Sequence, residues 1–230
     1  MKLLAFETAT EACSVALWLD GEVLERFELA PRRHAELALP WADELLARAG
    51  VARGDLDAIA IGRGPGAFTG VRLAVAIGQG IAFALDRPMV AVSTLAALAM
   101  QAPGPRVLAS IDARMGEVYA AAFERQGDAL LALAPERVLA PGEVALPGDG
   151  NDWVGVGTGF GAVEGALASS LGARFARIDA QALPHAADVA RLAAGAFARG
   201  EGLAPERVEP AYLRDNVALT LVEQEKARKR

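Results

Sequence analysis

The sequence predicts an α/β protein built from two similar lobes, and three observations lead to this fold class. Apolar segments of strand length alternate with segments of helical spacing along the 230 residues. The opening strand–turn–strand pattern returns about 105 residues later, which indicates an internal duplication. Pro-Gly-Pro at 103–105 interrupts the chain between the two occurrences. We therefore expect an N-terminal lobe at 1–103, a C-terminal lobe at 104–212 and a tail at 213–230.

The first lobe is expected to open with three strands, at residues 2–6, 13–19 and 22–29. The Asp20-Gly21 pair favours a two-residue hairpin turn, so these strands should form an antiparallel meander. The later elements alternate helix and strand, at residues 34–49, 57–62, 69–85 and 89–92, before an alanine-rich helix.

The second lobe should repeat the opening hairpin with strands at 107–112 and 117–123. Further elements are expected as a strand, helix, strand and helix at residues 153–156, 160–171, 174–178 and 186–199. The intervening segment 124–150 is rich in loops and gives no clear pattern. Each lobe opens with a strand that ends in a carboxylate, which makes Glu7 and Asp112 equivalent positions.

Composition restricts the possible chemistry. A net charge of −6 and a pI near 5.1 do not favour direct binding of a nucleic-acid backbone. All lysines lie within the first two or the last five residues, so a phosphate-loop lysine or a Schiff-base lysine inside the fold is excluded. The single cysteine, Cys13, excludes an internal disulfide and fits a reducing compartment.

We expect a cytoplasmic protein that does not span a membrane. Glu7 interrupts the apolar N-terminal run too early for a secretory signal. The longest apolar helix candidate, 71–85, is shorter than the roughly 20 residues that a bilayer requires.

A glycine-rich loop, Gly-Arg-Gly-Pro-Gly-Ala-Phe-Thr-Gly-Val-Arg, occupies positions 62–72 between a strand and a helix. Its N–H groups, the helix dipole and the arginines could hold an anion, although the Lys-Ser/Thr pair of a phosphate loop is missing. A tight turn packed on the neighbouring lobe or on a partner needs the same glycines. Both interpretations stay open for Arg63, Gly64, Pro65, Gly66, Phe68, Thr69, Gly70 and Arg72.

The loop and other segments in the same order strongly resemble the bacterial TsaB (YeaZ) family. The further matching segments read ETATEACSVAL, VSTL, IDARMGEVY and YLRDNVA, at residues 7–17, 92–95, 111–119 and 212–218. The resemblance spans most of the chain, and the chain is identified as a member of this family by these motifs.

The resemblance implies an actin-like or sugar-kinase-like (ASKHA) fold, in which two duplicated ribonuclease-H-like lobes with mixed sheets face each other across a nucleotide cleft. It also implies a non-catalytic subunit that scaffolds and activates the catalytic TsaD protein, together with the ATPase TsaE. That complex transfers threonylcarbamoyl from threonylcarbamoyl-AMP to N6 of the transfer-RNA adenosine adjacent to the anticodon.

The same resemblance implies that this chain has no catalytic residue, no metal and no tightly bound cofactor, since the complex uses ATP through a partner. Contact with transfer RNA is expected to be indirect, and the chain could form a homodimer when alone. The catalytic relative carries a metal-binding His-x-x-x-His on its first helix, whereas here His34 is followed four residues later by Ala38.

The helix at 69–85 is apolar on nearly every side, so it must be covered all round. It carries a stripe of small residues at every fourth position, and the first helix offers larger apolar residues for the same surface. We expect a helical-bundle interface with a partner, while packing within the chain remains equally open. The expected contact residues are Leu37, Trp41, Leu45, Ala74, Gly78 and Ala82.

A nucleotide-dependent enzyme is the first alternative, because Glu7 and Asp112 would lie at the nucleotide cleft of an actin-like fold. Neither acid is followed directly by a glycine, which hinders close approach to phosphates, so the cleft is expected to be vestigial. Residues 157–162, Gly-Thr-Gly-Phe-Gly-Ala, with Asp179 imitate a dinucleotide fingerprint. Too few elements follow them to complete a doubly wound sheet.

A peptidase that acts on its partner is the second alternative. Cys13 or Ser14 would be the nucleophile, with His34 or His185 as the base. No G-x-S-x-G motif supports this alternative, and core packing explains two residues in a strand equally well. The basic end of the chain, at 225–230, could touch RNA or an acidic partner.

Overall fold

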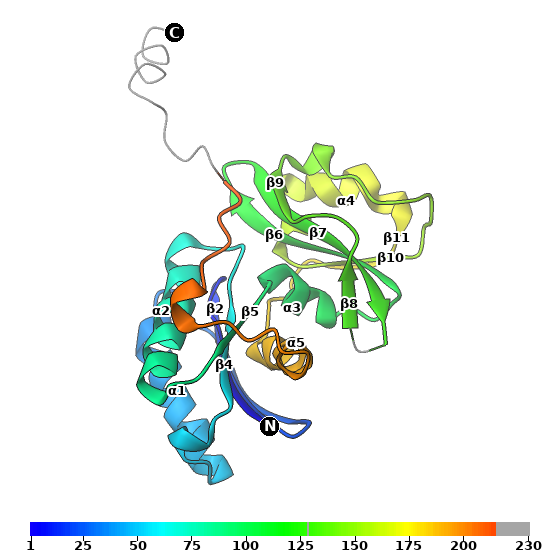
Figure 1. Ribbon diagram of the computed structural model, residues 1–230. Helices are drawn as coiled ribbons and strands as arrows, with labels where there is room; N and C mark the ends of the chain where they lie inside the picture. Colours follow the sequence, from blue (N-terminus) through cyan, green and yellow to red (C-terminus); the bar gives the residue numbers. More distant parts are fainter. Residues whose placement is uncertain (128, 215–230) are drawn as a thin grey trace, which may run out of the picture.

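The computed structural model describes residues 1–127 and 129–214 as two lobes of similar construction (Figure 1). Each lobe is a mixed sheet with helices packed on it, as expected for the actin-like fold. The expected tail at 213–230, apart from residues 213 and 214, lies outside the described residues, and so does its basic end at 225–230.

The first sheet has the strand order β3-β2-β1-β4-β5. Its antiparallel part consists of β1 (Lys2–Glu7), β2 (Ala12–Leu19) and β3 (Glu22–Leu29), which confirms the predicted meander. Two parallel strands, β4 (Ala58–Gly62) and β5 (Met89–Val92), continue the sheet beside β1.

The second sheet has the strand order β11-β10-β6-β7-β8. Read from the β8 edge, this order repeats that of the first sheet. Its strands are β6 (Arg106–Arg114), β7 (Glu117–Gln126), β8 (Ala129–Ala132), β10 (Trp153–Val156) and β11 (Phe175–Asp179), while the short β9 (Arg137–Leu139) also pairs with β7. Three antiparallel strands are again followed by two parallel ones. The shared strand order confirms the duplication.

Helices from its own half of the chain cover one face of each sheet. In the first lobe, α1 (His34–Ala49) and α2 (Phe68–Leu85) pack on β2 and β4. In the second lobe the predicted helix at 160–171 shortens to α4 (Ala166–Leu171), which two 3₁₀ turns precede. Left-handed backbone at Val163, Glu164 and Gly165 prevents a continuous helix there.

The two remaining helices are exchanged between the lobes. After β5, α3 (Thr94–Met100) packs on β6 and β7 of the second sheet, whereas α5 (Ala186–Ala198), after β11, packs on β1, β2 and β4 of the first. The two helices also contact each other between the sheets (Figure 1). The expected boundary at residue 103 is therefore wrong, because each lobe is completed by a helix from the other half of the chain.

Beyond α5 the chain stays with the first lobe before it crosses to the second. We call residues 203–214 the C-terminal strap. Leu203 pairs with Met89, and the Gln79 amide donates hydrogen bonds to the carbonyls of Pro205 and Val208 over 2.9 and 3.2 Å. The strap then runs along the N-terminal end of α2 towards the β6–β7 turn (Figure 1). The first half of the strap thus belongs to the first lobe, whereas the sequence predicts that residues 104–212 form the C-terminal lobe.

Among the described residues, α2 is the helix that is long and apolar enough to cross a membrane, with 18 residues and a mean hydropathy of 1.5. Only length and composition support that possibility. Its inner face packs on β4 and its Gln79 side chain holds the strap, so it serves as a core helix of the first lobe.

Candidate functional site

The small-residue stripe of α2 faces the chain's own sheet. Ala74 and Ala82 have no exposed surface, and a Cβ added to Gly78 would lie 2.6 Å from both Ile61 Cγ2 and Met89 Cε. The stripe lets the helix approach the sheet closely. The expectation that Ala74, Gly78 and Ala82 contact a partner is therefore corrected, because a partner cannot reach them in the folded chain.

The expected contact residues of α1 are also mostly internal. Trp41 and Leu45 retain 6% and 0% of their surface, and both belong to the core beneath α1. Leu37 is half-buried against the same core. Trp41 and Leu45 thus support the helix from below rather than offer a docking surface.

The outer side of the same two helices is apolar and exposed. Leu39 on α1 is 48% exposed and Phe83 on α2 is 59% exposed. Between the helices lies an apolar groove of about 320 Å³, which we call the α1–α2 groove. Its lining includes Leu39, Leu46, Gly80, Ile81, Ala84 and Leu85. The exposed apolar surface of α1 and α2 therefore consists of other residues than the six that the sequence predicted.

The glycine-rich loop is attached to the turn between β1 and β2. A Cβ at Gly66 would lie 2.4 Å from the Ala9 carbonyl oxygen, and one at Gly70 would lie 2.0 Å from the Thr8 carbonyl oxygen. The Ala67 N–H donates to that Ala9 oxygen over 2.7 Å, and Thr8 Oγ1 donates to the Gly70 carbonyl over 2.7 Å. Contact between two backbones therefore accounts for the glycines, which supports the structural interpretation of the loop.

The loop's hydrogen-bonding groups and charges are also engaged. The N–H groups of Arg63 and Gly64 donate to the Val92 carbonyl and to Thr94 Oγ1, over 2.8 and 3.2 Å. The Arg63 guanidinium pairs with Glu136 of the second lobe over 3.2 Å. These contacts occupy groups that an anion would need.

Arg72 is held by aromatic rings. Its guanidinium carbon lies 3.1 Å from the centre of the Phe68 ring and 4.8 Å from the centre of the Tyr212 ring. Phe68 begins α2, Arg72 follows one turn later, and Tyr212 comes from the C-terminal strap. We call these three residues the aromatic stack. The Pro65 and Thr69 side chains make no hydrogen bond or ion pair found in the described part of the chain.

Glu7 lies inside the protein rather than in an open cleft. Its carboxylate accepts hydrogen bonds from the Ala9 N–H over 2.8 Å and from Thr94 Oγ1 over 2.9 Å. Gly62 leaves room for it, because a Cβ there would lie 2.0 Å from Oε2. Burial raises the pKa of Glu7 to about 7, against the lowering effect of these hydrogen bonds. The expectation that Glu7 lines a nucleotide cleft is thus corrected.

Asp112 ends up in a different setting from its counterpart. Its carboxylate is 26% exposed and pairs with Arg114 over 2.8 Å on the β6–β7 turn. It also accepts the Arg114 N–H over 2.8 Å. The two acids keep equivalent places at the ends of β1 and β6, yet only Asp112 reaches solvent, so they do not form a matched pair.

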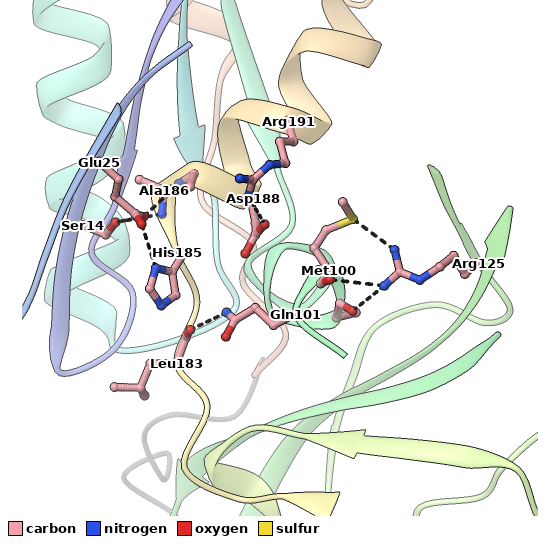
Figure 2. A network of polar contacts seen from close by, with 12 residues as sticks. Ser14, Glu25, Met100, Gln101, Arg125, Leu183, His185, Ala186, Asp188 and Arg191 are labelled. Carbon is pink, nitrogen blue, oxygen red and sulfur yellow. Dashed lines mark hydrogen bonds and ion pairs between the residues drawn. The ribbon is translucent and has the colours of Figure 1, made fainter. Parts of the chain in front are cut away.

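A polar cluster, which the sequence did not reveal, fixes the start of α5 to the first sheet (Figure 2). Glu25 on β3 accepts hydrogen bonds from Ser14 Oγ and the Ala187 N–H over 2.7 and 3.0 Å, and it pairs with His185 over 3.0 Å. Ser14 Oγ also accepts the Ala186 N–H over 2.9 Å. Strand side chains thus cap α5, whose own N-cap residue provides no side-chain cap.

The pKa values of His185 and Glu25 shift in opposite directions in this cluster. The hydrogen bond to Glu25 raises the pKa of His185 and outweighs the opposing effect of burial. Burial would raise the pKa of Glu25, but hydrogen bonds from His185, Ala187 and Ser14 lower it below its ordinary value. Both shifts favour the ion pair.

The two connections between the lobes lie next to each other. Gln101, after α3, donates to the Leu183 carbonyl, before α5, over 2.5 Å (Figure 2). The Arg125 guanidinium on β7 donates to the carbonyls of Ala99, Met100 and Ala102 over 3.1, 3.3 and 3.0 Å. These bonds complete the C-terminal end of α3 and fix the junction.

The histidines do not form nucleophile–base pairs with Cys13 or Ser14. Ser14 Oγ is committed to Glu25, and His185 bonds to Glu25 rather than to that hydroxyl. His34 Nε2 lies 3.0 and 3.1 Å from the carbonyl oxygens of Thr10 and Ala12. Burial raises the pKa of Cys13 to about 11. The arrangement gives no geometric support to a peptidase.

The dinucleotide-like segment is also explained by close packing. A Cβ at Gly157 would lie 2.3 Å from the Ser110 carbonyl oxygen, and one at Gly159 would lie 2.0 Å from Ser110 Oγ. These glycines let the segment rest on β6. Within the residues that the structure describes, no group of three His, Cys, Asp or Glu side chains could hold a metal ion.

Comparison with known proteins gives a consistent result. Residues 27–221 match the family model described as "TsaD: tRNA N6-adenosine threonylcarbamoyltransferase". The tRNA threonylcarbamoyladenosine biosynthesis protein TsaB of Escherichia coli is 44% identical over 95% of this chain and 96% of its own length. The protein of the same name from Haemophilus influenzae is 37% identical over 94% of this chain and 95% of its own length.

A solved structure agrees with these relatives. YeaZ from Pseudomonas aeruginosa superposes with a TM-score of 0.85 at 49% identity, covering 92% of this chain and 99% of that one. Both the sequence match and the shared architecture extend over nearly the whole chain. The chain therefore belongs to the TsaB (YeaZ) family of tRNA threonylcarbamoyladenosine biosynthesis proteins, whose members have the actin-like fold.

Proposed function

We propose that this chain is a non-catalytic partner subunit in the synthesis of threonylcarbamoyladenosine on transfer RNA. In this role it binds and activates a catalytic TsaD subunit, which transfers threonylcarbamoyl from threonylcarbamoyl-AMP to the adenosine adjacent to the anticodon. The complex uses ATP through its ATPase, TsaE, so this chain needs no tightly bound cofactor of its own. The complex works in the cytoplasm.

The observation that carries this proposal is the apolar α1–α2 groove. Leu39, a large apolar residue of its lining, is 48% exposed, and Ile81, Ala84 and Leu85 line the opposite side. Gly80 has no atom within 4 Å of an added Cβ, so the helix surface beside it is open. An apolar face of two neighbouring helices fits the helices of another subunit, which would form a bundle with them. A second copy of this chain could occupy the groove when the catalytic subunit is absent.

Two features support a non-catalytic role. The loop that would approach a phosphate is bonded to the chain's own backbone, and Glu7 is buried beneath it. The possible nucleophiles Cys13 and Ser14 are buried in β2. The chain thus keeps the two-lobed fold of an actin-like enzyme while its equivalent positions serve packing.

Binding of the catalytic subunit tests the proposal through two matched substitutions. Leu39→Arg places a charge in the groove, whereas Leu131→Arg, at a leucine 49% exposed on β8, places the same charge on the other lobe. We expect Leu39→Arg to weaken binding by about 30-fold or more and Leu131→Arg to leave it unchanged. Isothermal titration calorimetry with purified TsaD measures both.

Modification of unmodified transfer RNA by the reconstituted proteins provides the functional readout. Omission of this chain, or its replacement by the Leu39→Arg variant, should remove most of the modification. In a separate assay, the isolated chain should hydrolyse no ATP. Equal modification with and without the chain would refute the proposal. Substitution of Ala74 or Gly78 cannot serve this test, because both residues are buried and a charge there would unfold the lobe.

A further inference from the structure

The aromatic stack forms an exposed surface where the strap passes α2, away from the α1–α2 groove. Phe68 and Tyr212 are 65% and 54% exposed although the Arg72 guanidinium covers one face of each ring. The opposite faces of the two rings are therefore open to solvent. Met115, 82% exposed on the β6–β7 turn, extends this surface onto the second lobe, where its Sδ lies 3.5 Å from Arg214.

No acid of the part of the chain that the structure describes holds the guanidinium at the centre of the stack. Arg72 Nη1 is buried without a hydrogen bond, and no carboxylate within the described ranges forms an ion pair with this side chain. Cation–π contact with two rings fixes it instead. The rings are thus oriented in advance, which lowers the entropy lost when a flat ligand stacks on them.

Three of the arginines around the stack are paired with carboxylates. The ion pairs are Arg63–Glu136, Arg114–Asp112 and Arg214–Glu117. Arg72 is a fourth arginine, and it pairs with no acid of residues 1–127 and 129–214. The chain as a whole carries a charge of −6. These three carboxylates are paired with arginines, however, so they repel an approaching polyanion less than free carboxylates would.

We propose that the aromatic stack is a platform on which an unpaired base of an RNA stacks; this rests on the proposed function, in which the RNA is a transfer RNA. Bases in single-stranded loops stack on exposed aromatic side chains and on arginine guanidinium planes. Such stacking does not depend on a strongly basic surface, so an acidic subunit can provide it. This contact adds to the binding of transfer RNA by the catalytic partner.

Binding of two RNA probes tests the platform. The first probe is the anticodon stem-loop as a hairpin with 2-aminopurine in the loop, and the second is the same strand annealed to its complement. We expect Phe68→Ala and Tyr212→Ala to weaken hairpin binding roughly tenfold each, because each removes one stacking face. Tyr212→Phe keeps the ring and should stay within about twofold of the wild type. Duplex binding should not change in any variant.

Phe83→Ala is the matched control, since Phe83 is an aromatic residue 59% exposed at the other end of α2. It should leave hairpin binding by the isolated chain unchanged. Hairpin affinities of Phe68→Ala and Tyr212→Ala equal to the wild type would overturn the platform. Loss of TsaD binding by these variants, with unchanged hairpin affinity, would assign the surface to a protein instead and would also overturn it.

The measurements are made on the full chain alone and on its complex with TsaD. If the wild-type chain does not assemble with TsaD, the proposed function fails, yet the titration of the isolated chain still decides whether the stack binds unpaired bases. If assembly is normal and the isolated chain and the complex both show no effect of the aromatic substitutions, the platform fails alone.

Discussion

Thr94 Oγ1 donates a hydrogen bond to Glu7 Oε2 over 2.9 Å, between residues 87 positions apart in the chain. The bond joins the first residue of α3 to the last residue of β1 in the buried interior. Because α3 packs on the second sheet, this contact connects the end of a first-lobe strand to a helix of the other lobe.

Glu7 should make the stability of the protein depend on pH. Burial raises its pKa from 4.5 to about 7, so between these values the folded chain binds more protons than the unfolded chain. The free energy of unfolding contributed by this group therefore falls as pH rises from about 4.5 to about 7, by at most about 3 kcal/mol. Glu7→Gln should flatten this decline, as urea unfolding at a series of pH values would show. An identical slope in both proteins would contradict this.

Glu25 should be essential for anchoring α5. Glu25→Ala leaves Ser14 Oγ and the Ala187 N–H without their acceptor and removes the partner of His185. We expect a loss of about 2 kcal/mol in the free energy of unfolding. Glu22→Ala, at an exposed residue of the same strand, should cost less than about 0.5 kcal/mol. Chemical denaturation compares the two variants.

The Glu25–His185 pair should be strongest over an intermediate pH range. The raised pKa of His185 means that its stabilisation is complete below the ordinary value of 6.5 and is lost as pH rises through the folded value. The lowered pKa of Glu25 means that its stabilisation is present above the ordinary value of 4.5 and is lost on acidification. In His185→Gln the loss of stability above pH 6.5 should be smaller than in the wild type. Melting temperatures across pH 4 to 9, with a control variant at His34, check this assignment.

Two glycines on α2 should respond in opposite ways to the same substitution. Gly78→Ala places a Cβ 2.6 Å from Ile61 and Met89, so it should cost about 1–3 kcal/mol of stability. Gly80→Ala meets no atom within 4 Å and removes a flexible residue from a helix, which should add roughly 0.5–1 kcal/mol. Thermal unfolding measures both, and a stabilising Gly78→Ala would show that α2 does not lie close to the sheet.

The attachment of the glycine-rich loop should depend on Gly70. A Cβ there would lie 2.0 Å from the Thr8 carbonyl oxygen, which is backbone and cannot rotate away. Gly70→Ala should lift the loop and cost about 3 kcal/mol, whereas Gly54→Ala, where no atom lies within 4 Å, should cost little. Amide hydrogen exchange should show weaker protection of the Ala67 N–H in Gly70→Ala. Unchanged protection would mean that the loop is held elsewhere.

Much of the fold could be predicted from the sequence because strand patterns and turn residues are local signals. The Asp20-Gly21 turn and the repeated hairpin correctly indicated two similar sheets. The exchange of α3 and α5 could not be predicted, since an apolar helix face does not specify which of two sheets it covers. The small-residue stripe on α2 was equally ambiguous between the chain's own sheet and another protein.

Other parts of the site depend on contacts between distant residues. Glu25 and His185 are 160 positions apart, so no local sequence pattern predicts the bond between them. Phe68 and Arg72 are one helical turn apart, a spacing that could have indicated their contact, whereas Tyr212 comes from the strap. Glu7 was predicted to lie at a vestigial nucleotide cleft, whereas its burial depends on residues far away in the sequence, such as Gly62 and Thr94.

The exchange of α3 and α5 has a consequence for how the protein is made. The first sheet is complete once β5 has left the ribosome, but its α5-covered face stays bare until residue 198 has been synthesised. At ordinary elongation rates this interval lasts on the order of ten seconds. The nascent chain thus exposes an apolar surface for that time, and such transient exposure during synthesis favours aggregation.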